Sequence, residues 1–218
     1  MSSIVVSGDT SGSVTLSAPA VSGSSVLTLP VATDTLVGKA TTDTLTNKTL
    51  TSPVISGTPS GVGTLTSDTA KASTSGTYID FTGIPSWAKR ITVMFNGVST
   101  NGTSNIQIQI GNGTIVTTGY VGSTTDTEGA GSGSVNYSAG ILLNNSGVAT
   151  YTRYGAILFT LVGSNIWTVN GTLGLSNLGR TSVIGGGITL GGALDRVRIT
   201  TVNGTDLFDA GSINILYE

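Results

Sequence analysis

The chain has 218 residues, with 32 glycines, no cysteine and no histidine. Charged residues make up 9% of it, against about 25% in ordinary globular proteins, and the formal net charge is −2. The lack of cysteine excludes disulfide and thiolate chemistry, and the lack of histidine removes the commonest general base and zinc ligand. This composition favours an all-β structural or binding protein over an enzyme.

The charge distribution and hydropathy exclude further classes. The nine basic residues are scattered, and their two short clusters, at 89–90 and 196–198, form no basic stripe of the kind that binds nucleic acid. No apolar run is long enough for a bilayer span, and residues 1–20 lack the basic start and apolar run of a signal peptide. We therefore expect no membrane insertion, no bound metal or cofactor, and no catalytic residues.

Residues 1–63 differ from the rest because they contain no aromatic residue and four of the five prolines. Two related units, at 12–20 and 24–32, are short alternating runs that end at a proline, as expected of edge strands. In residues 33–57 single leucines and valines are separated by Thr, Ser, Asp and Asn. This is too little apolar surface for a core within one chain, so we expect copies of the segment to supply it in an intertwined homo-oligomer.

One stretch of this segment has a recognisable pattern. Residues 42–57 read Thr-Asp-Thr-Leu-Thr-Asn-Lys-Thr-Leu-Thr-Ser-Pro-Val-Ile-Ser-Gly. This resembles a stretch that recurs in bacteriophage tail-fibre and related virion fibre proteins, with Val54 at its variable place. The units at 12–20 and 24–32 resemble the same proteins. The resemblance implies that residues 1–63 form a fibrous shaft or an anchor to the virion.

Residues 64–75 are small, polar and interrupted by glycine, which predicts a linker, although a short helix over 64–72 stays open. From residue 76 onward the chain alternates apolar and polar residues in short runs. Five Asn-Gly pairs, at 96–97, 101–102, 112–113, 170–171 and 203–204, predict hairpin turns between these runs.

About ten strands at regular spacing favour an antiparallel β-sandwich, jelly-roll-like, over residues 76–218. In one run Ile106, Ile108 and Ile110 should face the core, with Gln107 and Gln109 facing outward. The opening of this region, Gly-Thr-Tyr-Ile-Asp-Phe-Thr-Gly-Ile-Pro from residue 76, resembles the start of C-terminal head domains of phage fibres. That resemblance implies a trimeric β-sandwich head and identifies no ligand.

The longest loop-like stretch, 119–134, carries Asp126 and Glu128 and is flanked by Tyr120 and Tyr137. A tyrosine face can stack on a sugar ring and a carboxylate can accept hydrogen bonds from its hydroxyls, so these four residues form the candidate receptor site. A mobile loop without a partner, or a loop buried between subunits, is the alternative. Catalysis by the two acids is not expected, because a glycine-rich loop does not fix them on rigid elements.

The sequence thus predicts an all-β chain: an N-terminal intertwined fibrous segment, a linker and an antiparallel sandwich head. The hypothesis for function is a homotrimeric phage fibre protein, made in the host cytoplasm and located on the virion surface. Its N-terminal segment would bind other virion proteins, and its head would attach to the host, with cell-surface polysaccharide as the candidate ligand. A capsid or tail decoration protein that binds only virion proteins is the alternative. A polysaccharide depolymerase is disfavoured, because neither a long β-helix nor clefted carboxylates are evident.

Overall fold

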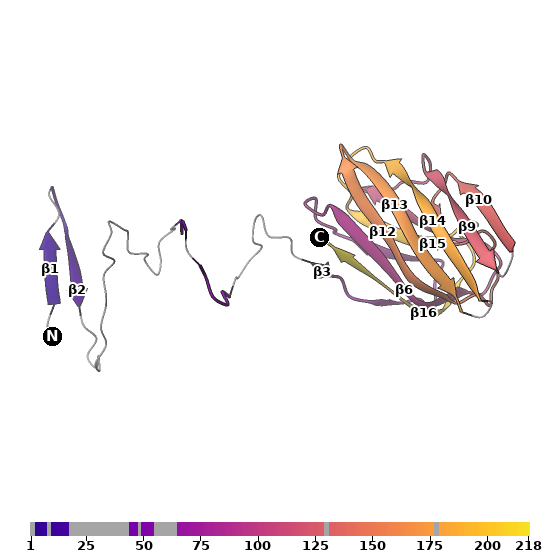
Figure 1. Cartoon of the computed structure of the whole chain (residues 1–218), viewed down its shortest axis with the longest axis horizontal. Helices are drawn as coiled ribbons and strands as arrows, with labels where there is room; N and C mark the ends of the chain where they lie inside the picture. Colours follow the sequence, from indigo (N-terminus) through magenta and orange to yellow (C-terminus); the bar gives the residue numbers. More distant parts are fainter. Residues whose placement is uncertain are drawn as a thin grey trace. The chain divides into compact units, whose positions relative to one another are not determined.

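A computed structural model describes residues 3–7, 10–17, 44–47, 49–54, 65–128, 131–176 and 179–218 (Figure 1). The chain divides into two compact units, Met1–Ile55 and Ser56–Glu218. The described residues form strands, turns and irregular segments, with no helix among them. Accordingly, this part of the chain contains no helix with the length and apolarity needed to cross a membrane.

The N-terminal unit contains one described hairpin, in which β1 (Ser3–Ser7) pairs antiparallel with β2 (Ser13–Ser17). Consecutive side chains of a strand point to opposite faces. Val5 and Val6 are both 57% exposed, so apolar side chains lie open on both faces of the hairpin. The predicted strand at 12–20 corresponds to β2, whereas the one at 24–32 lies outside the described residues.

The C-terminal unit is an antiparallel sandwich of two sheets, which confirms the predicted fold class. The large sheet has the order β10-β9-β14-β13-β12-β6-β16-β3, with β4 also paired to β16, and the small sheet has the order β11-β7-β15-β5, with β8 paired to β7. The strands are β3 (Thr66–Ser67), β4 (Lys71–Ala72), β5 (Tyr78–Thr82), β6 (Arg90–Thr100), β7 (Ile106–Asn112), β8 (Thr114–Ile115), β9 (Val121–Glu128), β10 (Gly131–Tyr137), β11 (Ile141–Leu142), β12 (Arg153–Gly163), β13 (Ile166–Leu175), β14 (Arg180–Thr189), β15 (Arg196–Thr201) and β16 (Phe208–Tyr217).

One hydrophobic core fills the space between the two sheets. Long strands such as β6 and β13 bury alternate residues along most of their length, as a sheet covered on one face requires, whereas β7 is buried on both faces. Among the fully buried side chains are Ile91 and Val93 of β6, Phe159 of β12, and Ile108 and Ile110 of β7. The alternating pattern of the sequence therefore identified the core correctly.

The two glutamines of β7, which were predicted to face outward, are more buried than an outward position implies. Gln107 and Gln109 do lie on the face of β7 opposite the core isoleucines, yet they are only 4% and 6% exposed. Gln109 Nε2 donates to the carbonyl oxygen of Ala139 at 2.8 Å. Gly140 packs so closely on Gln107 that a Cβ there would lie 2.6 Å from its Oε1. The segment that leads into β11 therefore covers the two amides.

The Asn-Gly pairs do not all make turns. Those at 112–113 and 203–204 do, with Gly113 and Gly204 at positive φ. The pairs at 96–97 and 170–171 lie inside β6 and β13, so the prediction of turns there is wrong. Gly97, at a φ of 68°, accompanies a register shift between β6 and its partners, and at Gly171 a Cβ would overlap the backbone of β12. At these two sites glycine serves a bulge and a close strand approach.

The segment predicted as a linker, 64–75, contributes to the sandwich. Within it β3 and β4 both pair with β16, and the Ser73 amide donates to the Gly211 carbonyl at 2.9 Å. The short helix left open over 64–72 is therefore wrong for its described residues, 65–72, because the free edge of β16 supplies backbone partners that a small polar segment can use. Residues 64 and 55–63 lie outside the described part.

Candidate functional site at the β9–β10 hairpin

The stretch predicted as a loop, 119–134, is largely a hairpin, so that prediction is wrong. β9 pairs with β10 on one side and with β14 on the other. Threonine has a high strand propensity, and β9 carries three threonines, with hydrogen bonds along both edges. The strand propensity of threonine and the hydrogen bonds to β10 and β14 outweigh the glycine and serine content that suggested a loop.

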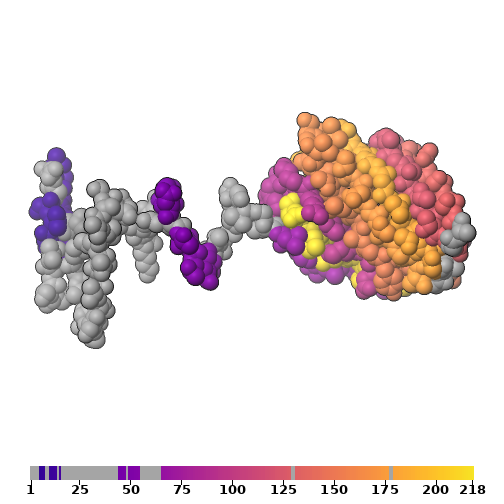
Figure 2. Space-filling model, in the orientation of Figure 1, coloured from indigo at the N-terminus to yellow at the C-terminus, as the bar shows by residue number. Residues whose placement is uncertain are grey.

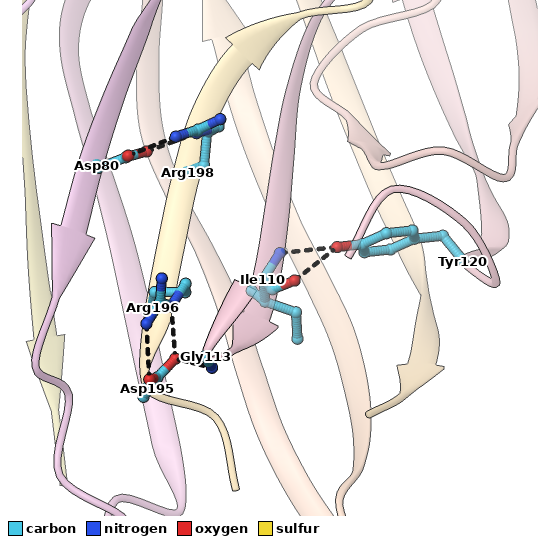
Figure 3. A network of polar contacts seen from close by, with 7 residues as sticks. All are labelled: Asp80, Ile110, Gly113, Tyr120, Asp195, Arg196 and Arg198. Carbon is cyan, nitrogen blue, oxygen red and sulfur yellow. Dashed lines mark hydrogen bonds and ion pairs between the residues drawn. The ribbon is translucent and has the colours of Figure 1, made fainter. Parts of the chain in front are cut away.

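Tyr120 is buried, not exposed as predicted. It is 2% exposed, and its hydroxyl lies 2.7 Å from the backbone nitrogen of Ile110, which donates to it (Figure 3). The same hydroxyl can donate to the carbonyl oxygens of Ile110, at 3.2 Å, and Val116, at 3.0 Å. Burial raises the pKa of Tyr120 well above its ordinary value. Its ring belongs to the core and is not a platform for a sugar.

Tyr137 is buried as well, with 7% of its surface exposed. Its hydroxyl donates to the carbonyl oxygen of Gly185 at 2.8 Å, and burial raises its pKa to about 12. With Val121 and Asn136, the two tyrosines line a hollow of about 390 Å³. The Tyr137 hydroxyl reaches β14 within the large sheet, and the Tyr120 hydroxyl reaches β7 of the small sheet, so both tyrosines attach the hairpin to the rest of the sandwich.

The predicted acids lie near the opposite end of the hairpin. Asp126 is 4% exposed and pairs across the sheet with Ser182. One of its carboxylate oxygens accepts from Ser182 Oγ at 2.7 Å, and the other accepts from the backbone nitrogen of Asn145 at 3.1 Å. Asp126 thus joins β9, β14 and the segment after β11, and both of its oxygens are already engaged.

Glu128 is the exposed member of the pair. Its carboxylate accepts from Arg180 Nε at 2.6 Å and forms an ion pair with the same guanidinium. The hydrogen bond to Glu128 raises the pKa of Arg180. Arg180 also donates to the Tyr151 hydroxyl at 3.3 Å, and its guanidinium lies 5.8 Å from that ring. Glu128 therefore faces solvent, although its charge is compensated.

A buried arginine lies in the same cross-strand row as Arg180. Arg153 pairs with Leu175, which pairs in turn with Arg180. Arg153 is fully buried, and it donates to Asn144 Oδ1 at 2.9 Å and to the Tyr151 carbonyl at 3.1 Å. Burial lowers its pKa to about 10, and the negative charge of Asp126 acts in the opposite direction. The charge of Asp126 thus offsets part of the cost of burying Arg153.

The acids line a pocket of about 380 Å³ together with Arg180 and hydrogen-bonding groups of Ser132, Asn145 and Ser146. The described residues contain no group of three or more acidic side chains that could hold a metal ion. Glu128, Arg180 and the serines can exchange hydrogen bonds with a ligand, whereas Asp126 is nearly buried and both of its oxygens already accept hydrogen bonds within the protein. The structure thus brings the two acids together and the two tyrosines together, but in separate pockets.

No pattern in the sequence indicated that Arg153, Arg180 and Asn145 belong to this cluster. Each is a single polar residue among strand or loop residues, and their proximity depends on the register of β12, β13, β14 and β9. Only the unusual arginine within the apolar alternation of β12 could have suggested a buried charge.

Comparison of the chain with protein-family models, with curated proteins and with solved structures gave no match.

Proposed function

We propose that the chain is a homotrimeric virion fibre protein of a bacteriophage, with an N-terminal shaft segment and a C-terminal sandwich that attaches to the host surface. The resemblance of residues 42–57 to phage fibre shafts suggests the class. The observation that carries the proposal is the contrast in burial between the two units.

In the N-terminal unit the described apolar side chains remain open to solvent. Val54 is 98% exposed, Leu50 58% and Leu45 44%, besides Val5 and Val6 of the hairpin. The sandwich, in contrast, buries more than thirty apolar side chains. Each exposed Leu or Val side chain forgoes roughly 1.5–3 kcal/mol of burial. Further copies of the segment can supply this burial, because the same side chains are then available from every chain.

The large sheet supports assembly of the sandwiches as well. On β9, β14, β13, β12 and β6 the side chains that point away from the core include one charged residue, Arg90, at the start of β6. Exposed surfaces are usually about 25–35% charged. Val121, Val183 and Ile166 lie on this face, 74%, 52% and 43% exposed. In Figure 2 the strands β12, β13 and β14 form a broad continuous surface. Copies that meet through this face desolvate no charge other than Arg90.

Two valines of matched exposure test this arrangement. Val183 lies on the outward face of the large sheet and Val202 follows β15, and they are 52% and 54% exposed. We expect Val183→Arg to weaken association when the mass of the full chain is followed on dilution, whereas Val202→Arg leaves it unchanged. Equal behaviour of the two variants would exclude the large sheet from the assembly.

Attachment is tested with the fluorescently labelled full chain, incubated in parallel with host cells and with phage particles stripped of the protein. Saturable adsorption to the cells supports the proposal. Binding to particles alone, with no adsorption to cells, would contradict the attachment role and would favour the alternative, a decoration protein that binds only virion proteins.

A further inference from the structure

The outer face of the small sheet carries two rows of polar side chains across three strands. Register places Tyr78 of β5, Thr200 of β15 and Gln107 of β7 in one row. The next row contains Asp80, Arg198 and Gln109 of the same strands. The residues between them, Ile79, Ile199 and Ile108, point into the core and are at most 6% exposed. The six polar side chains therefore share the opposite face.

These rows form the floor of a groove of about 390 Å³. We call it the small-sheet groove and define it by its lining residues: Thr77, Tyr78, Gln107, Gln109, Arg198, Thr200, Thr201, Val202, Asn203 and Gly204. The turn after β15 provides one wall. The hydroxyl of Thr200 donates to the Thr77 carbonyl at 2.9 Å, and the hydroxyl of Thr201 donates to Asn203 Oδ1 at 2.8 Å. Internal hydrogen bonds thus hold the walls in place before a ligand arrives.

The single positive charge of the groove is neutralised. Arg198 donates through Nε and through its Nη2 to the two carboxylate oxygens of Asp80, each at 2.7 Å (Figure 3). This hydrogen bonding to Asp80 raises the pKa of Arg198. A guanidinium held in a two-pronged pair with a carboxylate offers little attraction to an anion. The groove is therefore suited to an uncharged ligand.

An open aromatic ring stands at the edge of the groove. Tyr78 is 53% exposed, and the guanidinium of Arg198 lies 4.2 Å from its ring centroid. Because Arg198 is itself fixed by Asp80, the tyrosine loses little conformational freedom on binding. An exposed, fixed aromatic ring is a platform for the apolar face of a sugar ring.

The groove floor supplies both kinds of hydrogen-bonding group. A glutamine amide carries two donor hydrogens and an acceptor oxygen, so one such side chain can pair with a hydroxyl in either role. Both glutamines line the groove, although the neighbouring segment leaves only 4% of Gln107 and 6% of Gln109 exposed. The Nε2 of Gln109 already donates to the Ala139 carbonyl, so Gln107 is the amide that a ligand hydroxyl can use. Thr200 Oγ1 donates to Thr77 and can still accept, and Asn203 keeps one Nδ2 hydrogen, because its Oδ1 already accepts from Thr201, Thr205 and Asp206 and its Nδ2 donates to Asp206.

We propose that the small-sheet groove binds a neutral saccharide, with a sugar ring stacked on Tyr78 and hydroxyls hydrogen-bonded to Gln107, Thr200 and Asn203. This inference rests on the proposed attachment role and names a ligand class and a site for it. The site differs from the predicted one at the β9–β10 hairpin, whose tyrosines are buried.

The test is saturation-transfer NMR on the full chain. The probes are neutral oligosaccharides of glucose, galactose, mannose and N-acetylglucosamine, and one anionic polysaccharide, heparin. We expect at least one neutral probe to bind. Tyr78→Ala should weaken its affinity about tenfold or more, and Tyr78→Phe should retain most of it. Trp87→Ala is the control, because Trp87 is an aromatic residue of comparable exposure, at 41%, that lies between β5 and β6, outside both the small-sheet groove and the large sheet, and it should leave the affinity unchanged.

Three results would overturn the inference: no binding by any neutral probe, binding of heparin alone, or equal effects of the alanine variants at positions 78 and 87. None of these results alters the mass of the assembly or the adsorption of the parent protein to cells, so failure of the groove is distinguishable from failure of the proposed function. Parallel thermal melting of all variants establishes that each remains folded.

Discussion

Replacing Gly186 with alanine should destabilise the sandwich, whereas the same change at Gly185 should not. A Cβ at position 186 would overlap the Tyr137 hydroxyl and the carbonyl oxygen of Val121 and would lie 3.0 Å from Gly122 Cα. A Cβ at position 185 would meet no heavy atom within 4 Å. The two residues are neighbours on β14. Comparison of the two variants therefore separates the steric effect of the added Cβ from the effect of alanine on strand propensity.

The magnitude follows from the contacts. Overpacking of this kind costs roughly 1–3 kcal/mol, and displacement of the Tyr137 ring breaks its hydrogen bond to Gly185, for about 1 kcal/mol more. The free energy of unfolding should therefore fall by roughly 2–4 kcal/mol, which lowers the melting temperature by about 5–15 °C for a domain of this size. Gly185→Ala should raise stability by about 0.5–1 kcal/mol, because glycine is the less favourable residue within a strand.

The assay is thermal unfolding of the two full-length variants and the parent, followed by far-ultraviolet circular dichroism at equal concentration. Tyr137→Phe combined with Gly186→Ala should recover only part of the loss, because the Val121 carbonyl remains in the way. Equal melting temperatures for the two alanine variants would refute the close packing of β9, β14 and the Tyr137 side chain.

The remaining predictions concern the polar groups of the hairpin. Asp126→Ala should cost roughly 2–3 kcal/mol of stability, because it leaves the buried Ser182 hydroxyl and the Asn145 amide without their acceptor. Glu128→Gln should cost much less, because that carboxylate faces solvent. Equal chemical-denaturation midpoints would contradict this. The Tyr137 pKa is raised to about 12 from an ordinary value near 10, so its contribution to stability is fully present below pH 10 and lost as the pH rises through 12. Denaturation at pH 8 and pH 11.5 should accordingly show a smaller difference between the parent and Tyr137→Phe at the higher pH, and a constant difference would count against it. Because the chain has no cysteine, dithiothreitol should leave the melting temperature unchanged, and a large shift would conflict with that composition.

Local alternation predicted the core of the sandwich well, because residues such as Ile106, Ile108 and Ile110 have no alternative burial in a two-layer protein. It failed where the sequence was polar. β9 buries Thr124 and Asp126, and their stability comes from partners distant in sequence, the Leu142 carbonyl and Ser182. No local pattern reports such partners.

Prediction of the candidate site from local sequence was less successful than prediction of the core, for the same reason. Tyr120 and Tyr137 were expected to be exposed because they flank a glycine-rich stretch, but the Tyr120 hydroxyl bonds to the backbone of β7 in the small sheet and the Tyr137 hydroxyl to that of β14. The small-sheet groove depends on three strands that are far apart in the sequence, and the strand pairings that align Tyr78 with Thr200 and Gln107 are set by the whole sandwich. Sequence periodicity assigns such residues to a face and leaves their neighbours unknown.

Multi-angle light scattering of the purified full chain at micromolar concentration tests the central proposal most directly. The exposed leucines and valines of the N-terminal unit favour association between copies, and so does the outward face of β6, β9, β12, β13 and β14 in the large sheet, where Arg90 is the one charged residue. We expect a mass of three times 21.8 kDa, insensitive to reductant. A mass of 21.8 kDa that persists as the concentration is raised would contradict the proposal, because a single chain would then be stable with those side chains exposed.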